Sequence, residues 1–300
     1  MTRANEGEHP VVVGVDGSAS ALHAVRWAAR EARLRGAPLR LVHVCHLAPV
    51  RHPKQVPPPP EYRAAIIEEG RHWLTEAADA ARHAAPGLSV ITIWQTGAAA
   101  EVLVDESRDA QLMVLGSRGL GGFVSLLVGS VALALAAHGH CPVVVTRTST
   151  VADAPPEEGP VVVGVDGSEL SDAALTFAFE AAAARDVALV VVHTWHDVHL
   201  AGAWTLLPGT IDWDWLQSEE EDRLAERIAP WLEKFPHVEV RSVVARDRPA
   251  RVLLEHAADA RLVVVGSRGR GAFTGVGLGS VSQTLLHHAE CPIAVARTRT

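Results

Sequence analysis

Glycines and serines with one repeated spacing are the residues of this sequence best suited to chemistry. The spacing occurs twice, as Gly116-x2-Gly119-x9-Gly129-Ser130 and as Gly266-x2-Gly269-x9-Gly279-Ser280. In each copy an apolar strand pattern leads into the first glycine, and an apolar helical pattern follows the serine. Glycine lets the backbone approach a ligand closely, and a helix start offers unpaired N–H groups and the positive end of the dipole. The motif therefore predicts two sites for an anion, most often a phosphate.

An aspartate ends the first strand pattern of each copy, Asp16 in the first and Asp166 in the second. In an open parallel α/β sheet, ligands bind beyond the carboxyl ends of the strands, where the strand order reverses. If the first and fourth strands flank that point, the carboxylate and the glycine loop face one crevice. We then expect a nucleotide to place its phosphates on Gly119, Gly129 and Ser130, and its ribose near Asp16 and Gly116.

Each candidate also has a purely structural interpretation. The segment Asp16-Gly17-Ser18 could be only a helix-capping turn, and the glycines could only shape a surface loop. Arg118 and Arg268 follow the first glycine of each loop, and they either reach a phosphate with a planar guanidinium or are solvated. For the aspartates and glycines, an identical spacing kept twice favours the ligand.

Histidines near the second strand of each half suggest a metal site. They are His43, His46, His193, His196 and His199. The two halves keep only His43 with His193 and His46 with His196, and no matching carboxylate or cysteine cluster accompanies them. We therefore expect satisfied or surface histidines and no metal.

The elements that must position these residues occur twice, because the chain is a tandem duplication with an offset of 150. Strand patterns alternate with helical patterns in both halves, which predicts a parallel sheet with right-handed crossovers. The expected organisation is a domain over residues 9–148, a polar and proline-bearing linker over 149–160, and a second domain over 161–300. In the first domain we expect strands at 11–15, 39–44, 89–95, 111–115 and 143–146, and helices from Ser18 to Gly36 and over 61–84, 98–107 and 131–138.

Composition narrows the class of protein. The chain has 300 residues, 48% of them hydrophobic, which allows two cores of ordinary size. No apolar run is long enough for a membrane span, the start MTRANEGEHP lacks a signal-peptide pattern, and the three cysteines form no disulfide framework, so a cytoplasmic protein is the default. A net charge of −8 argues against a nucleic-acid surface. Much of the acidic excess lies in Asp212–Asp222, which we interpret as a solvated helix start.

Catalysis has less support in the sequence than binding. There is no Gly-x4-Gly-Lys-[Ser/Thr] motif, and the chain contains only two lysines, Lys54 and Lys234. Neither first strand is followed by a G-x-G-x-x-G loop, and no Ser/His/Asp constellation recurs in both halves. We therefore expect no catalytic residues and a binding protein.

The segments VVVGVDGS, LVHV and GSRG, with GSV ten residues beyond the second glycine of each loop, resemble the universal stress protein family in its tandem form. The resemblance covers nearly all of both halves, and the glycine pattern is typical of the ATP-binding members. It implies two domains, each an open five-stranded parallel sheet of order 3-2-1-4-5 with helices on both faces. It also implies ATP, with or without Mg²⁺, in each half. The residues it points to are Gly14, Asp16, Val44, Gly116, Arg118, Gly119, Gly129, Ser130 and Val131, and Gly164, Asp166, Thr194, Gly266, Arg268, Gly269, Gly279, Ser280, Val281 and Ser282.

Two departures distinguish the halves. Thr194 replaces Val44, which has no effect if only the backbone is used, and Ser282 supplies a hydroxyl that Ala132 lacks. We therefore expect the C-terminal site to bind ATP more tightly, through one additional hydrogen bond.

The sequence thus predicts a stress-response protein that binds an adenine nucleotide as a sensor or regulator. The alternatives are a slow ATPase or phosphotransferase that uses the same site, and a structural dimerisation module without ligand. The strands at 143–146 and 293–296 should lie at sheet edges, and pairing them would give an intrachain pseudo-dimer. A homodimer of chains and an unidentified signalling partner remain open.

Overall fold

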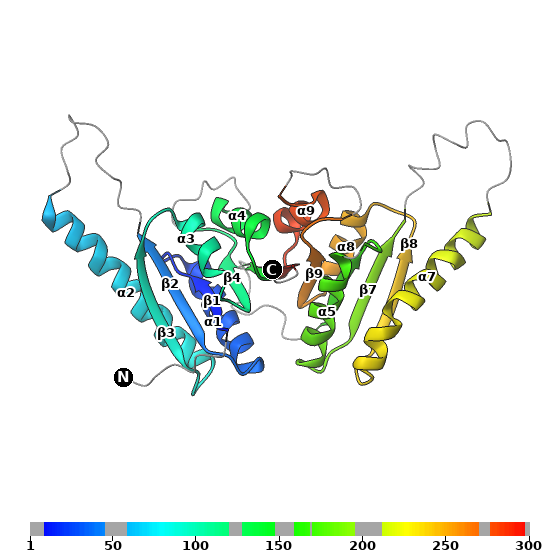
Figure 1. Cartoon of the computed structure of the whole chain (residues 1–300), viewed down its shortest axis with the longest axis horizontal. Coiled ribbons are helices and arrows are strands. Elements are labelled where there is room, and N and C mark those ends of the chain that lie inside the picture. Colours follow the sequence, from blue (N-terminus) through cyan, green and yellow to red (C-terminus); the bar gives the residue numbers. More distant parts are fainter. Residues whose placement is uncertain are drawn as a thin grey trace, which may run out of the picture. The chain divides into compact units, whose positions relative to one another are not determined.

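The computed structural model describes residues 9–45, 59–119, 128–147, 159–168, 170–195, 212–269 and 277–297. The chain divides into two compact units, Met1–Asp153 with Arg299–Thr300, and Ala154–Thr298. This division falls within the segment 149–160 that the sequence predicts as a linker. Each unit is an α/β domain in which helices cover both faces of a sheet (Figure 1).

The N-terminal unit has a five-stranded parallel sheet of order β3-β2-β1-β4-β5. Its elements are β1 (Val11–Gly14), α1 (Ala19–Leu34), β2 (Leu39–Cys45), α2 (Pro60–Ala84), β3 (Val90–Thr96), α3 (Ala99–Glu106), β4 (Leu112–Gly116), α4 (Ser130–His138) and β5 (Val143–Thr146). Helices α1 and α2 contact each other on one face of the sheet, and α3 and α4 contact each other on the other. The strand order reverses between β1 and β4, which are the strands that end beside Asp16 and Gly116.

The C-terminal unit repeats this topology, with the order β8-β7-β6-β9-β10 and all neighbouring strands parallel. Its elements are β6 (Val161–Val165), α5 (Leu170–Ala183), β7 (Leu189–Thr194), α7 (Trp213–Lys234), β8 (Val240–Ala245), α8 (Pro249–Ala257), β9 (Leu262–Gly266), α9 (Ser280–His288) and β10 (Ile293–Ala296). The fold class and strand order implied by the resemblance are therefore confirmed in both halves.

The central strands of each sheet are continuous apolar runs because both of their faces are covered. Val11, Val12 and Val13 of β1 are 0% exposed, and so are Val161, Val162 and Val163 of β6. Branched apolar side chains pack on both faces of a parallel sheet, and this explains why the strand patterns do not alternate with polar residues.

The first helix begins and ends where the sequence predicts. Ser18 is its N-cap, and the Ser18 hydroxyl accepts a hydrogen bond from the backbone N–H of Ala21 at 3.1 Å. Gly36 follows the last turn with a φ of +64°, a left-handed conformation that favours glycine. These local signals fix the direction in which the chain leaves β1, and so they fix the position of Asp16.

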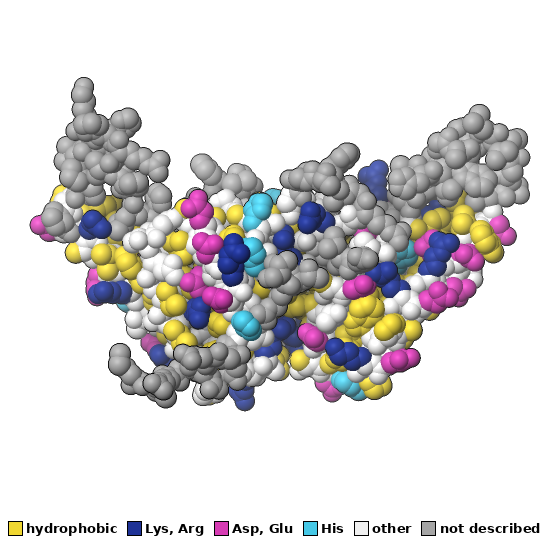
Figure 2. All heavy atoms as spheres, viewed as in Figure 1, with side chains coloured by type: hydrophobic (Ala, Val, Ile, Leu, Met, Phe, Trp, Pro, Cys, Tyr) yellow, Lys and Arg dark blue, Asp and Glu magenta, His cyan; other side chains and the backbone are white. Residues whose placement is uncertain are grey.

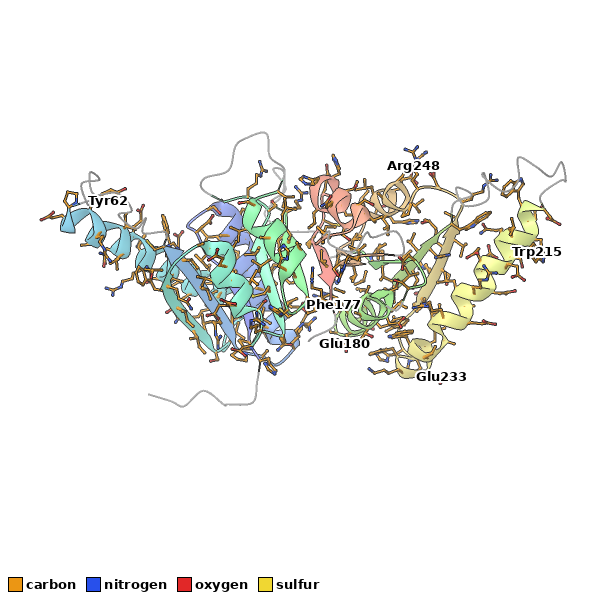
Figure 3. All side chains as sticks on the ribbon, turned by 45° about the horizontal axis from the view of Figure 1, so that its top comes forward. Tyr62, Phe177, Glu180, Trp215, Glu233 and Arg248 are labelled. Atoms are coloured by element: carbon orange, nitrogen blue, oxygen red, sulfur yellow. The ribbon has the colours of Figure 1, made fainter. Side chains whose placement is uncertain are left out.

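Acidic side chains gather along α7 (Figure 2), as expected for a solvated helix. Asp212 caps the helix by accepting a hydrogen bond from the N–H of Trp215 at 3.0 Å, and this confirms the interpretation of the acidic segment as a helix start. Figure 3 shows Trp215 near the beginning of the helix and Glu233 near its end. None of the helices in the described part of the chain is long and apolar enough to cross a membrane.

Candidate functional site

The turn after β1 is a helix-capping turn, and its carboxylate also lines a cavity. The backbone N–H of Ser18 donates to Asp16 Oδ1 at 3.0 Å, and Gly17 between them has a φ of +83°. One carboxylate oxygen therefore closes the turn. The structural interpretation and the ligand interpretation are thus compatible, because Asp16 also belongs to the wall of the cavity at the carboxyl end of the sheet.

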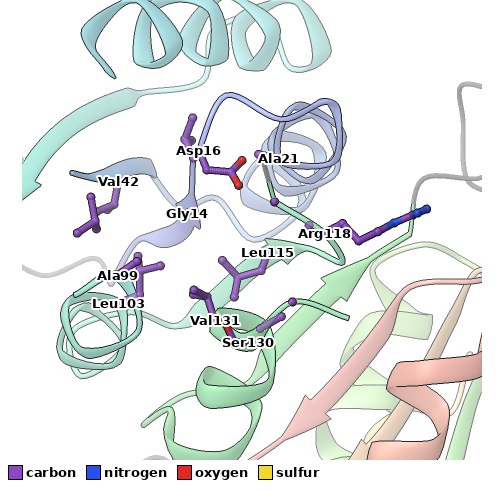
Figure 4. Close-up of a pocket in the computed structure, with 16 residues that line it drawn as sticks. Gly14, Asp16, Ala21, Val42, Ala99, Leu103, Leu115, Arg118, Ser130 and Val131 are labelled. Atoms are coloured by element: carbon purple, nitrogen blue, oxygen red, sulfur yellow. The ribbon is translucent and has the colours of Figure 1, made fainter. Parts of the chain in front are cut away.

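This cavity brings together every residue that the sequence predicts for the N-terminal site. Its volume is about 470 Å³, within the range of roughly 300 to 1,000 Å³ that is usual for small-molecule and cofactor sites. The predicted residues that line it are Gly14, Asp16, Val44, Gly116, Arg118, Gly119, Gly129, Ser130 and Val131 (Figure 4). They come from the ends of β1, β2 and β4, from the loop after β4 and from the start of α4.

Two of the glycines pack closely, Gly119 against the Asp16 carboxylate and Gly116 against the backbone of α1. A Cβ on Gly119 would lie 2.2 Å from Asp16 Oδ2, and a Cβ on Gly116 would lie 2.5 Å from Ser20 Oγ. No real Cβ makes contacts that short. The glycine loop and the Asp16 carboxylate therefore lie side by side, with no room for a side chain on Gly119 unless the carboxylate moves.

Gly129 has a different role. Its φ is −73°, and the nearest atom to an added Cβ would be Ser117 O at 3.7 Å, so neither conformation nor packing within the fold requires glycine there. Its N–H donates to Ser117 O at 2.8 Å and is not available to a ligand. Gly129 therefore offers space, and the N–H groups of Ser130 and Val131 in the first turn of α4 are the ones that suit a phosphate.

The backbone of Val44 points into the crevice. Val42 O accepts from Val15 N at 2.8 Å on the β1 side of β2, and Cys45 O accepts from Gly97 N at 3.1 Å on the β3 side. Peptide groups alternate between the two sides of a strand, so the polar groups of Val44 face the β1 side beyond the end of β1. A backbone donor and acceptor are thus presented at the switch point, irrespective of the side chain.

The C-terminal half repeats the close contact of loop and carboxylate. A Cβ on Gly269 would lie 2.4 Å from Asp166 Oδ2. Asp166 Oδ1 accepts hydrogen bonds from Ser168 N at 3.0 Å and from the hydroxyls of Ser168 and Ser171, each at 2.6 Å. The N–H of Gly279 donates to Ser267 O at 2.8 Å, as its counterpart Gly129 does to Ser117. The two halves therefore present the same backbone geometry around their aspartates.

Comparison with known proteins identifies the fold and its family. The family model described as Universal stress protein family matches residues 8–147 and again residues 159–297. The chain belongs to the universal stress protein family. It is 43% identical over 291 residues to universal stress protein Rv2623 of Mycobacterium tuberculosis, with 96% of each chain covered, and 41% identical over 293 residues to Rv2005c of the same species, with 97% of each covered. A universal stress protein structure from Archaeoglobus fulgidus superposes with a TM-score of 0.71 at 18% identity, covering 97% of this chain and 99% of that one, and so shares the fold.

The site of this universal stress protein contains residues that sequence reasoning missed. They are the apolar residues of the cavity wall, Val15, Ala21, Val42, Ala99, Leu103 and Leu115; Ala132, which the sequence singles out by comparison with Ser282, lines it as well. Val42 could have been found, because it lies two residues before Val44 and therefore on the same face of the strand. Ala99 and Leu103 come from α3, whose packing over β1 and β2 no local pattern specifies.

The structure bears on two of the predicted side-chain roles. The Ser282 hydroxyl donates to Gly266 O at 2.7 Å, so its single proton is used within the fold in this structure. This bond argues against the additional phosphate contact from which the sequence predicts a tighter C-terminal site, and that ranking stays a prediction. The Arg118 side chain runs away from Asp16, Leu115 and Val131 in Figure 4, and this favours the solvated interpretation of that arginine.

The histidines on the second strands are satisfied within the fold. Nδ1 of His43 lies 2.8 Å from Val15 O, and Nδ1 of His193 lies 3.1 Å from Val165 O. Nε2 of His193 lies 3.0 Å from Glu220 Oε2. His46, His196 and His199 lie outside the described residues. Among the residues that are described, no three His, Cys, Asp or Glu side chains gather as metal ligands would.

Proposed function

We propose that this universal stress protein binds ATP in each half and acts as a nucleotide-dependent sensor or regulator of the stress response. One observation carries the proposal: nine residues selected by sequence, from segments far apart in the chain, line a single cavity of about 470 Å³. Residues that only shaped loops would have no reason to converge on one cavity at the switch point.

The chemistry of the cavity wall fits each part of an adenine nucleotide. The N–H groups of Ser130 and Val131 begin a helix of nine residues and suit the phosphates. Asp16 has a carboxylate oxygen beside Gly119 and suits the ribose hydroxyls. An apolar wall that includes Val42 and Leu103 suits the base, and the backbone of Val44 lies beside it.

In the C-terminal half the same roles fall to the equivalent residues. The ribose would be held by Asp166, the base edge by the backbone of Thr194, and the phosphates by the first turn of α9 beyond Gly279. Gly164, Gly266, Arg268, Gly269, Ser280 and Val281 complete the proposed site, and Ser282 supports it through its bond to Gly266 O. A bound nucleotide stabilises the folded state of its half by mass action, so occupancy can report the nucleotide supply. The proposal includes a cytoplasmic location, which agrees with three free cysteines.

Nucleotide extraction from freshly purified protein tests the proposal. We expect an adenine nucleotide in the extract, identified by mass spectrometry, and saturable binding when ATP is titrated into the emptied protein. An emptied protein that shows no heat of binding with ATP would support a structural module instead. ATP turnover that exceeds that of a Gly129→Val, Gly279→Val control would support the slow ATPase or phosphotransferase.

A further inference from the structure

The turn that carries Asp16 is held from the side of the sheet opposite the cavity. Val42 and Val44 line the cavity, so His43 between them points to the other face, where α2 packs on β2 and β3. Because a carbonyl oxygen can only accept, His43 Nδ1 donates to Val15 O, at 2.8 Å. The residue immediately before Asp16 is therefore fixed by a side chain from behind the sheet.

Helix α2 adds a second contact to this turn through Trp73. A Cβ on Gly17 would lie 2.4 Å from Cε2 of Trp73 and 2.5 Å from Cδ2, so the indole lies directly against the Gly17 backbone. The same indole meets the ring of His43 edge to face, with 5.2 Å between the ring centroids. One tryptophan thus contacts both the turn and the histidine that holds the turn.

The C-terminal half holds its turn from α7 with a different side chain. Arg227 Nη1 donates to Gly167 O at 2.9 Å, and Nη2 donates to Ser168 O at 2.5 Å and to Asp172 Oδ1 at 2.7 Å. A planar guanidinium can hold several acceptors at once in a fixed geometry. Ala77 occupies the equivalent position of α2, so the two halves use different residues for one task.

The histidine contact is kept in the C-terminal half and is extended to α7. Nδ1 of His193 lies 3.1 Å from Val165 O, and Nε2 lies 3.0 Å from Glu220 Oε2. Glu220 belongs to α7, and its other carboxylate oxygen accepts from Arg223 Nη1 at 2.6 Å. In both halves, therefore, the long helix contacts the turn after the first strand, residues 16–18 or 166–168, which we call the nucleotide turn. It also contacts the histidine beside that turn.

We propose that Trp73 and Arg227 are positioning residues for the nucleotide turns, and that α2 and α7 are thereby coupled to nucleotide binding in their own halves. The proposal rests on the proposed function, since the ligand is ATP at Asp16 and Asp166. Coupling between two parts of a protein is reciprocal. If Arg227 holds the nucleotide turn in the conformation that binds ATP, then bound ATP must also restrain α7. This holds although α7 packs on the face of the sheet opposite the site.

Calorimetric titration with ATP tests the positioning in the full chain. In a Gly129→Val background only the C-terminal site can bind, and there Arg227→Ala should weaken binding about tenfold, because a charged donor to two turn carbonyls is lost. Arg227→Lys, which keeps the charge but not the planar geometry, should fall between. Arg241→Ala, which removes an exposed arginine paired with Glu239, is the matched control and should change nothing. In a Gly279→Val background, Trp73→Ala should weaken the N-terminal site about two- to tenfold, because the aromatic contacts with Gly17 and His43 are lost.

Hydrogen exchange provides a readout that a merely structural role would not change. ATP should slow the exchange of amides in residues 224–231 of α7 in the unaltered chain and in Arg241→Ala, and this protection should disappear in Arg227→Ala. If ATP does not change the rate of amide exchange in α7 of the unaltered chain, the proposal is overturned, even if the variants fail to fold. Equal ATP affinity in Arg227→Ala and the control also overturns it. If the unaltered chain and the control do not bind ATP at all, the proposed function itself fails, and the positioning role fails with it.

Discussion

The hydroxyl of Ser282 donates a hydrogen bond to the carbonyl oxygen of Gly266, across 2.7 Å. Ser282 lies in the first turn of α9 and is 3% exposed, and Gly266 ends β9. The bond therefore ties the start of the helix to the strand that leads into the glycine loop. It makes Ser282 a support for the loop in the fold rather than a donor to the phosphate.

We accordingly expect Ser282→Ala to lower stability and to leave ATP affinity nearly unchanged. Loss of one buried hydrogen bond should reduce the free energy of unfolding by about 1 kcal/mol, and affinity at the C-terminal site should stay within about twofold. Urea unfolding and calorimetry in a Gly129→Val background measure the two effects. Thr284→Ala, which removes an exposed hydroxyl bonded to Ser280 O, is the control and should cost less. A tenfold loss of affinity in Ser282→Ala would restore the phosphate role.

The Gly129→Val, Gly279→Val double variant should lose ATP binding and keep its fold. Both glycines have ordinary negative φ values, −73° and −70°, and the nearest atoms to their added Cβ would lie at 3.7 Å and 3.4 Å. The fold therefore tolerates a side chain, while the branched carbons would fill the space beside the helix N-terminus that we assign to the phosphates. Calorimetry measures the loss of ATP binding, and circular dichroism on the same sample checks that the fold is kept. Unchanged affinity would place the ligand elsewhere.

Gly17→Ala should be markedly destabilising, because two separate effects add. Its φ of +83° strains any other residue, and the new Cβ would lie 2.4 Å from the Trp73 ring. Gly36→Ala is a matched control for the first effect alone, since its φ is +64° and its added Cβ would meet no atom within 4 Å. We expect a loss of about 1 kcal/mol for Gly36→Ala and about 3 kcal/mol for Gly17→Ala, measured by denaturant unfolding. Equal losses of unfolding free energy in the two variants would mean that the Trp73 ring moves aside without an energetic penalty.

The three cysteines should be unreactive in the native protein at neutral pH. All three are buried and form no disulfide. Burial raises the pKa of the Cys45 thiol, and this effect is larger than the opposing effect of the nearby Arg63 charge, which lowers that pKa. A raised pKa keeps the thiol protonated at neutral pH, and the thiolate is the reactive form. Iodoacetamide should therefore label no cysteine of the folded chain within minutes and all three after denaturation, as counted by mass spectrometry. Rapid labelling of Cys45 in the folded chain would contradict its burial.

The sequence by itself determined the duplication and the order of elements. It also determined the polar residues of each candidate site, the aspartate and the glycine loop. Asp16 could be predicted because a strand pattern ends there in a helix-capping turn. Gly119 could be predicted because it belongs to a loop between a strand pattern and a helix start. Both are local patterns, fixed by residues a few positions apart. The boundaries of β1, α1 and β4 differ from the predicted ranges by no more than two residues for the same reason.

Only the tertiary structure decided what surrounds those residues. The apolar wall formed by Leu103, the contact of Trp73 with Gly17 and the bond from Ser282 to Gly266 each join segments that are distant in sequence or that meet only when strand and helix pack. A hydroxyl or an indole has several possible partners, and its type does not say which one it meets. Side-chain packing across the sheet makes that choice, because a buried polar group must bond to the nearest partner that the fold provides.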